Sequence, residues 1–538
     1  MRLSPVRADL TAVPLSSWAR GVAALFLVGH GWIAWLLHST TLRTGNDDAL
    51  YLLLARSLRQ MSYRDFHVFG SPVHSQYPPG YPALLALTGG GLGLDLTWSS
   101  LTSVVLSMIA LALLFDLARR VLPLGFALGL LALLSLNGSL LVYAGAVRSE
   151  TPYIMLTVAS LWTLSVWPGS RKAVVLGVAL ALLAALTRSI GVTIIGAIGL
   201  LWLAQGYYRR TIQFGVAALL TFGAWTAWNF LAPVKFARRS YAMMATSVDP
   251  ALADKPWVIL IQRFKRFGEI YAFSIPANLN VPSIEGQWID NVAWLGLIFG
   301  LGAVGCYAAW RKAPLVPVYT ISYLLFLALW PTKLSRFMVP MIPLVLFLMV
   351  WGAGEIASRW RHRGVQAGFA LIGVLLLLGE TAEARSRLLA RSNCDPAAAI
   401  VSRDCPSRDE NSFARLTEYV RARLPDDAVV VTTKEATFGI VTGRRVMHPD
   451  MVVALLGKDF VPQLDSLGAD YIVINPLVPS HLAAQLLPRC QELLLVEDFP
   501  PRTALLKVRP DSGIVPDPRA CAVISRLAAD STWLGIQP

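Results

Sequence analysis

Long apolar runs recur along the chain up to about residue 380, and short polar segments separate them. A transmembrane helix needs about 20 mostly apolar residues, and fewer where neighbouring helices shield it. The pattern therefore predicts a polytopic α-helical membrane protein with about eleven spans. We place the spans at residues 19–38, 99–117, 121–142, 151–167, 173–188, 190–206, 212–230, 291–310, 314–330, 337–353 and 365–380.

One apolar run does not fit as a span. Residues 81–95 are short and contain three consecutive glycines, and runs of this length more often re-enter the membrane or lie at its interface. Counting the run as a span would also place Arg119 and Arg120 outside and invert every later loop. We expect a partial or interfacial helix here.

Basic residues indicate which loops face the cytoplasm, because Lys and Arg are enriched on that side. The N-terminal segment lacks a nearby small-residue cleavage site, so we expect a retained first span and a cytoplasmic N-terminus. The cytoplasmic ends then carry Arg2, Arg7, Arg20, Arg119, Arg120, Arg171, Lys172, Arg209, Arg210, Arg311, Lys312, Arg359, Arg361 and Arg363. The opposite side carries the first outer loop 39–98, residues 143–150, the large outer loop 231–290, residues 331–336 and everything after about residue 381.

The large outer loop is basic although this topology places it outside. Within it, residues 256–273 combine Trp, Ile and Phe with a basic middle, which is typical of an interfacial amphipathic helix. Such a helix either contacts anionic lipid head groups or forms a cationic shelf for a lipid-linked phosphate.

The sequence changes character after Glu380 and becomes mixed polar and apolar. Its spacing predicts an α/β domain outside the membrane, so we divide the chain into a membrane domain at 1–384 and an extracytoplasmic domain at 385–538. The expected elements of the second domain are a helix at 415–424 and strands at 427–433, 469–475, 492–499 and 503–509.

Four cysteines lie in this second domain, where an exported location permits disulfides. We expect the pairs Cys394–Cys405 and Cys490–Cys521. Cys306 lies within a predicted span, where we expect it to serve packing.

Composition excludes one class of function. The net charge of +14 is compatible with nucleic-acid binding, but only 15% of the residues are charged and the mean hydropathy is +0.55. Cytoplasmic loops of a membrane protein account for a basic balance of this kind. We therefore expect membrane lipids as partners and no nucleic acid.

Polar residues that packing does not explain collect on the outer side of the predicted bundle. They suggest a cavity lined by both carboxylates and cations, from Asp47, Asp48, Arg148, Glu150, Arg188, Lys333 and Arg336. Arginine binds phosphate in bidentate fashion, and a carboxylate takes a proton from a hydroxyl or holds a divalent metal. Such groups suit sugar transfer from a phosphate carrier. A transporter or flippase of lipid-linked sugars, or a membrane scaffold whose outer domain binds a partner, remain as alternatives.

Four short motifs in this order resemble the GT-C superfamily of polyprenyl-phosphate-sugar-dependent glycosyltransferases, especially its protein mannosyltransferase and aminoarabinose transferase-like branch, that is, glycosyltransferase family 39. They are Asp47 with Tyr51 after the first span, Pro78-Pro79-Gly80, Arg148-Ser149-Glu150, and Arg336-Phe337 followed by Pro340 and Pro343. The resemblance covers most of the membrane region, and an appended outer α/β domain is common in that branch.

The resemblance implies an inverting enzyme that uses a polyprenyl-phosphate sugar donor and a lipid, glycan or protein acceptor at the bacterial inner (plasma) membrane. Asp47 takes the position of the catalytic base, with Asp48 and Glu150 as further catalytic candidates. Alternatively, Asn46 or Asp47 only caps the helix that starts there, and Glu150 only pairs with Arg148. The candidates for the donor phosphate are Arg336, Lys333, Arg188 and Arg148, and those for substrate contact are Tyr51, Tyr77 and His74.

Two features of the site differ from the family or are left open. Some relatives have a phosphate-contacting lysine where this chain has Tyr77, so Arg336, Lys333 or Arg188 must supply that contact. Asp47 and Asp48 permit Mg²⁺ or Mn²⁺ without requiring it. His67 and His74 lie in a loop where we expect exposure, and we expect no tightly bound zinc.

Overall fold

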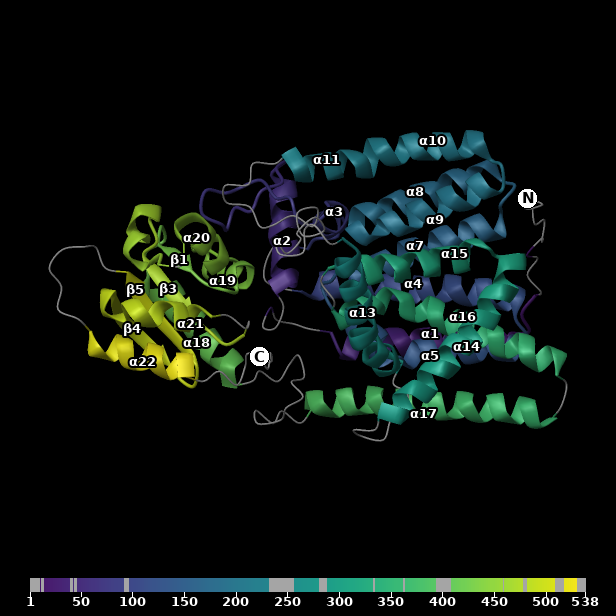
Figure 1. Cartoon of the computed structure of the whole chain (residues 1–538). Helices are drawn as coiled ribbons and strands as arrows, with labels where there is room; N and C mark the ends of the chain where they lie inside the picture. The colour runs from purple at the N-terminus through teal and green to yellow at the C-terminus, as the bar shows by residue number, and fades with distance from the viewer. Residues whose placement is uncertain are drawn as a thin grey trace.

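The computed structural model describes residues 10, 14–38, 42, 46–90, 96–231, 256–279, 288–331, 334–360, 363–392, 408–457, 459–477, 481–508 and 517–529. Figure 1 shows a bundle of long helices with a small sheet-containing domain at one end. The short helix α2 (Asn46–Arg59) lies between these two parts.

Helices occupy all eleven segments that the sequence predicts as spans. They are α1 (Ser17–Leu36), α4 (Thr97–Val121), α5 (Leu124–Leu136), α6 (Gly138–Ala144), α7 (Glu150–Val166), α8 (Arg171–Thr187), α9 (Val192–Ala204), α10 (Tyr208–Ala218), α11 (Ala224–Leu231), α14 (Trp288–Lys312), α15 (Leu315–Leu329), α16 (Ile342–Arg359) and α17 (Arg363–Ser392). Within the described ranges, six helices are long and apolar enough to cross a membrane, or seven if one bent pair counts as a span.

The bent pair is α5 and α6, which the sequence predicts as one segment at 121–142. The two helices meet at an angle of 59°, with Asn137 between them accepting a hydrogen bond from the Leu140 amide at 3.0 Å. The side-chain nitrogen of Asn137 donates a hydrogen bond to the Glu380 carboxylate of α17 at 2.8 Å. Because buried polar groups need partners, this contact stabilises the bend and holds α17 against it.

Two further predicted segments form helices at the end of the bundle that faces the sheet domain (Figure 1). The partial helix predicted at 81–95 is present as α3 (Gly80–Leu87), although residues 91–95 lie outside the described part. The helix predicted at 256–273 is present as α13 (Pro256–Asn278).

The C-terminal domain contains a five-stranded sheet in the order β2-β1-β3-β5-β4. Strands β1 (Val429–Val431), β3 (Tyr471–Ile474), β4 (Leu493–Phe499) and β5 (Thr503–Val508) confirm the four predicted strands. The sequence analysis missed β2 (Arg445–Met447), which pairs in parallel with β1. Strand β5 is antiparallel to both β3 and β4.

In the described part of this domain, five α-helices accompany the sheet: α18 (Arg408–Arg423), α19 (Glu435–Thr442), α20 (Pro449–Leu456), α21 (Leu482–Leu486) and α22 (Pro518–Ala529). The predicted disulfide Cys490–Cys521 is confirmed. Cys394 and Cys405 lie outside the described residues, and Cys306 packs against the bundle core. The domain boundary that we place at residue 384 falls within α17.

The first outer loop covers the open edge of this sheet. The Val446 amide of β2 donates to the His67 carbonyl at 2.8 Å, and the Phe69 amide donates to the Val446 carbonyl at 2.9 Å. The expectation that His67 and His74 are exposed is therefore wrong, since their exposed fractions are 7% and 1%. These two histidines are polar residues that make internal contacts instead of facing solvent.

Glycines allow α14 and α16 to approach closely. A Cβ at Gly305 would overlap the Leu348 carbonyl, and one at Gly352 would overlap the Leu301 carbonyl. Small residues of this kind let membrane helices pack backbone against backbone.

We predict that Gly305→Val lowers the stability of the folded protein by about 1–3 kcal/mol, because the added side chain forces the two helices apart. The measurement is the melting temperature of the purified protein in detergent. Gly300→Val is the matched control on the same helix, since open space surrounds that position. Equal losses from both variants would contradict the close-packing explanation.

Candidate active site

A cavity opens at the end of the bundle beside α2 and has an empty volume, including its open mouth, of about 690 Å³. It is lined by Asp47, Tyr51, Tyr77, Pro78, Arg148, Ser149, Glu150, Thr187, Arg188, Ser189, Ile190, Phe326, Leu327, Trp330, Arg336 and Phe337. The structure thus brings together residues from the four sequence motifs. Lys333 lies outside the described residues.

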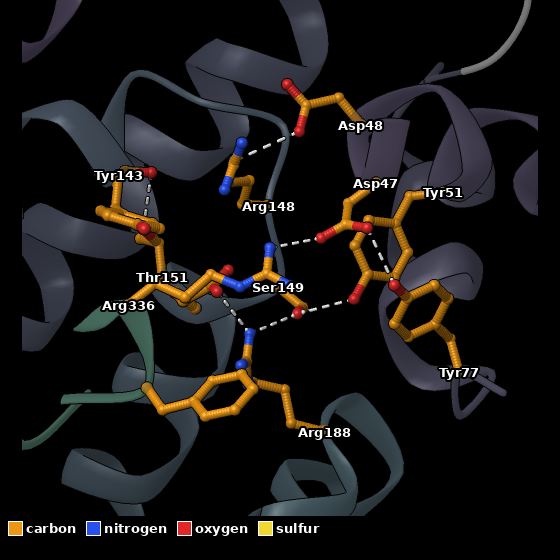
Figure 2. A network of polar contacts seen from close by, with 12 residues as sticks. Asp47, Asp48, Tyr51, Tyr77, Tyr143, Arg148, Ser149, Thr151, Arg188 and Arg336 are labelled. Atoms are coloured by element: carbon orange, nitrogen blue, oxygen red, sulfur yellow. Dashed lines mark hydrogen bonds and ion pairs between the residues drawn. The ribbon is translucent and has the colours of Figure 1, made fainter. Parts of the chain in front are cut away.

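The first turn of α2 directs its two carboxylates to different partners. Successive residues of an α-helix differ by about 100° in direction, so Asp47 and Asp48 cannot share one partner easily. Figure 2 shows Asp47 facing Arg336 and Tyr77, while Asp48 faces Arg148.

Asp47 is held from two sides. Arg336 donates to one of its carboxylate oxygens at 2.5 Å, and the Tyr77 hydroxyl donates to the other at 2.9 Å. Burial raises the pKa of the Asp47 carboxyl, but the hydrogen bonds and nearby positive charge outweigh burial and hold that pKa below its usual value. Asp47 is therefore ionised at neutral pH.

The other two acids also have arginine partners. Arg148 lies 3.3 Å from Asp48, and Arg188 lies 2.8 Å from Glu150. The suggested pairing of Glu150 with Arg148 is thus replaced by a pairing with Arg188. Burial lowers the pKa of Arg148, but the charges of Asp48 and Glu150 raise that pKa by more than burial lowers it. This guanidinium therefore stays charged.

Ser149 links these pairs across the cavity, a role that the sequence analysis missed. Its hydroxyl accepts a hydrogen bond from Arg188 at 2.9 Å and lies 2.9 Å from the Tyr51 hydroxyl. Its place inside the Arg148-Ser149-Glu150 motif was the available signal. The Tyr51 ring also packs against the Tyr77 ring, with centroids 4.9 Å apart.

Breaks between helices position Arg188 and Arg336. Arg188 has extended backbone between α8 and the 3-10 turn η1 (Ser189–Gly191). Arg336 lies in the 3-10 segment η4 (Ser335–Met341), which contains Pro340 and leads into α16 with Pro343 in its first turn. Helix ends at the cavity wall let both side chains reach inward.

His74 does not line the cavity but supports Tyr77 from behind. Its Nδ1 donates to Asp65 at 2.9 Å, because its Nε2 must accept the hydrogen bond from the Tyr77 amide at 2.8 Å. The Tyr63 hydroxyl donates to the Tyr77 carbonyl at 2.8 Å. The structure therefore gives His74 a supporting position, whereas the sequence analysis placed it in contact with substrate.

The acids of the cavity do not fit a resident metal. Among the residues that the structure describes, no three His, Cys, Asp or Glu side chains group closely enough to hold an ion. A cation at Asp47 and Asp48 would have to displace both Arg336 and Arg148.

No protein-family model matches the chain, and no curated protein matches it in sequence. Solved structures do match. ArnT from Cupriavidus metallidurans in the apo state has a TM-score of 0.59 at 14% identity over 91% of this chain and 98% of its own. Its form bound to undecaprenyl phosphate has a TM-score of 0.55 at 15% identity over 92% and 98%.

Two further glycosyltransferases have the same fold. The Archaeoglobus fulgidus oligosaccharyltransferase AglB, in complex with an inhibitory peptide and a dolichol-phosphate, has a TM-score of 0.56 at 12% identity over 96% of this chain and 78% of its own. The arabinofuranosyltransferase AftD from Mycobacteria has a TM-score of 0.51 at 15% identity over 94% and 41%. The chain therefore has the GT-C fold, as the sequence motifs predicted.

We predict that Arg336→Gln lowers stability at pH 7.5 by about 1–3 kcal/mol, because it leaves the Asp47 carboxylate without its charged partner. The difference from wild type should shrink as the pH falls towards 4. In wild type Asp47 stays ionised over this range, because Arg336 holds its pKa below the usual value. In the variant, burial without Arg336 raises that pKa, so protonation removes the buried charge as the pH falls towards 4.

The measurement is the melting temperature in detergent as a function of pH. Arg359→Gln is the control, because Arg359 forms an exposed ion pair with Glu355 on α16, and exposed pairs contribute about 0–1 kcal/mol. A loss from Arg336→Gln that stays constant from pH 7.5 to pH 4 would contradict the assignment.

Proposed function

We propose that this chain is an inverting membrane glycosyltransferase that moves a sugar from a polyprenyl-phosphate donor to a hydroxyl of an acceptor on the outer face of the membrane. Three kinds of observation support the proposal: the GT-C fold, the apolar helices, and the chemistry of the cavity. ArnT and AglB, which have this fold, occur in structures with undecaprenyl phosphate and dolichol-phosphate.

The observation that carries the proposal is the set of three carboxylate–arginine pairs in one cavity. Arg148, Arg188 and Arg336 all line it, and guanidinium groups match the oxygens of a phosphate in bidentate fashion. The same cavity presents the apolar side chains of Ile190 and Phe326. A lipid-linked phosphate needs both kinds of surface.

The reaction is a single displacement. The acceptor hydroxyl oxygen attacks the anomeric carbon of the sugar, the bond from that carbon to the phosphate oxygen breaks, and the polyprenyl phosphate leaves. Asp47 takes the hydroxyl proton. Arg336 and its neighbours stabilise the negative charge that develops on the leaving phosphate. Attack opposite to the departing phosphate inverts the anomeric configuration.

Donor binding prepares Asp47 for this role. In the structure Arg336 is bound to Asp47, and this pairing keeps the carboxylate a weak base. A phosphate that engages Arg336 removes this partner, and burial then raises the pKa of the Asp47 carboxyl. The base thus becomes stronger only when the donor is present.

We assign supporting roles to the remaining candidate residues. Asp48 and Glu150 hold Arg148 and Arg188 in place, and Tyr51 and Tyr77 contact substrate. Lys333 supplies a further cation for the phosphate.

The proposed topology has eleven crossings, a cytoplasmic N-terminus and an extracytoplasmic domain at 385–538, in the bacterial inner membrane. The acceptor is a lipid, a glycan or a protein.

We predict that Asp47→Asn reduces sugar transfer in isolated membranes by at least about 100-fold, while a polyprenyl-phosphate lipid still co-purifies. That lipid should be enriched over wild type, because the change frees Arg336 and removes a negative charge that repels phosphate. Arg336→Gln should lose the lipid. The lipids are identified by native mass spectrometry.

Asp465→Asn, an exposed position in the C-terminal domain, is the matched control and should behave as wild type. Near-normal transfer by Asp47→Asn would remove Asp47 as the base. Equal lipid retention in all variants, with transfer unchanged, would instead favour a flippase.

A further inference from the structure

Helix α19 of the C-terminal domain begins beside the first turn of α2. The Asn46 side-chain oxygen accepts hydrogen bonds from the Ala436 amide at 3.1 Å and from the Thr437 amide at 3.3 Å. The Asn46 side-chain nitrogen donates to Glu435 at 3.3 Å. One side chain from the membrane part thus bonds the first turn of a helix that lies 390 residues later in the sequence.

Asn46 supplies the cap that α19 lacks in its own sequence. The first amides of a helix have no partner within the helix, and the residue before it usually provides one from its side chain. In α19 that residue is Lys434, which makes no capping hydrogen bond because an ammonium group has no acceptor. Asparagine is among the best capping residues, so Asn46 fits this position.

Apolar and charged contacts extend the same interface. Ala436 and Ile440 of α19 belong to one buried cluster with Leu50 and Tyr51 of α2. Lys434 is only 3% exposed. Its surroundings include the charge of Asp48, which sits on α2 next to Asp47.

We propose that Asn46 is a positioning residue: by capping α19 it attaches the first turn of α2 to the C-terminal domain and so holds Asp47 on Arg336. The effect on the role of Asp47 rests on the proposed function, whereas the attachment of α2 to the C-terminal domain does not. Asn46 and Asp47 are consecutive, and the 2.5 Å contact of Asp47 with Arg336 does not tolerate a shift of the turn that carries it.

A test follows from the competition between Asp47 and phosphate for Arg336. If loss of the cap lets Asp47 move off Arg336, Asn46→Ala should tighten the binding of undecaprenyl phosphate, as Asp47→Asn does. We expect at least a fivefold tightening in an otherwise wild-type chain. The same change should have no effect when Asp47→Asn is already present, because Arg336 is then free in either case.

The experiment measures the dissociation constant of undecaprenyl phosphate for the full chain in lipid nanodiscs. It also measures hydrogen–deuterium exchange of residues 46–59, which should rise in Asn46→Ala. The double variant Asn46→Asp with Glu435→Gln moves the carboxylate from residue 435 to residue 46 and so preserves net charge. The new carboxylate is an acceptor for the α19 amides, and the new side-chain amide at position 435 is a donor to it. It should return both readouts to wild type. Gln463→Ala, an exposed amide in the same domain, is the control.

Two results would overturn the inference. Equal tightening by Asn46→Ala with and without Asp47→Asn would show that the cap does not act through Asp47. Unchanged exchange in residues 46–59 would show that it does not hold α2. If instead wild type, Asp47→Asn and Arg336→Gln all fail to bind the lipid, the proposed donor class fails, and the exchange measurement still decides whether Asn46 holds α2.

Discussion

The site depends on the cost of placing a charge where water is scarce. A carboxylate or guanidinium removed from water must have a partner of opposite charge with good hydrogen bonds. Asp47, Asp48 and Glu150 each meet an arginine from a different element of the fold. These pairs connect α2 with η4, α2 with the segment before α7, and α7 with the end of α8. The arginines that can bind a phosphate therefore also join the helix ends around the cavity.

In the proposed reaction, this arrangement couples donor binding to chemistry. Each of the three arginines that line the cavity is already paired with a carboxylate, so a phosphate does not meet an unpaired guanidinium there. It has to take over at least one arginine, and the acid released in that exchange becomes more basic because it stays buried. Arg336 is the arginine whose partner is the proposed base. In the proposed reaction, the Asp47 carboxylate is therefore either paired with Arg336 or released to act as the base.

Local hydrophobic patterns predicted the helices and most of the strands. Contacts between segments far apart in the sequence determined the features that those patterns did not reveal. Apolar runs placed every bundle helix, but the bend at Asn137 depends on Glu380, 243 residues away. Strand β2 has only three residues and takes its second neighbour from the first outer loop. His74 was assigned to substrate contact because nothing local reveals that Asp65 and Tyr77 use both its nitrogens. Asp47 and Arg336 were each identified, but not their pairing.

Asn46 shows why the two halves of the chain are best regarded as one structural unit. From its sequence it reads as the cap of its own helix, α2, whereas the structure uses its side chain on α19. The Asn46 oxygen caps α19 because Lys434, the residue before that helix, has no side-chain acceptor with which to cap it. The C-terminal domain thereby gains its attachment at the residue that precedes the proposed base. A domain held at that point is connected to the chemistry whether or not it touches the sugar or the acceptor.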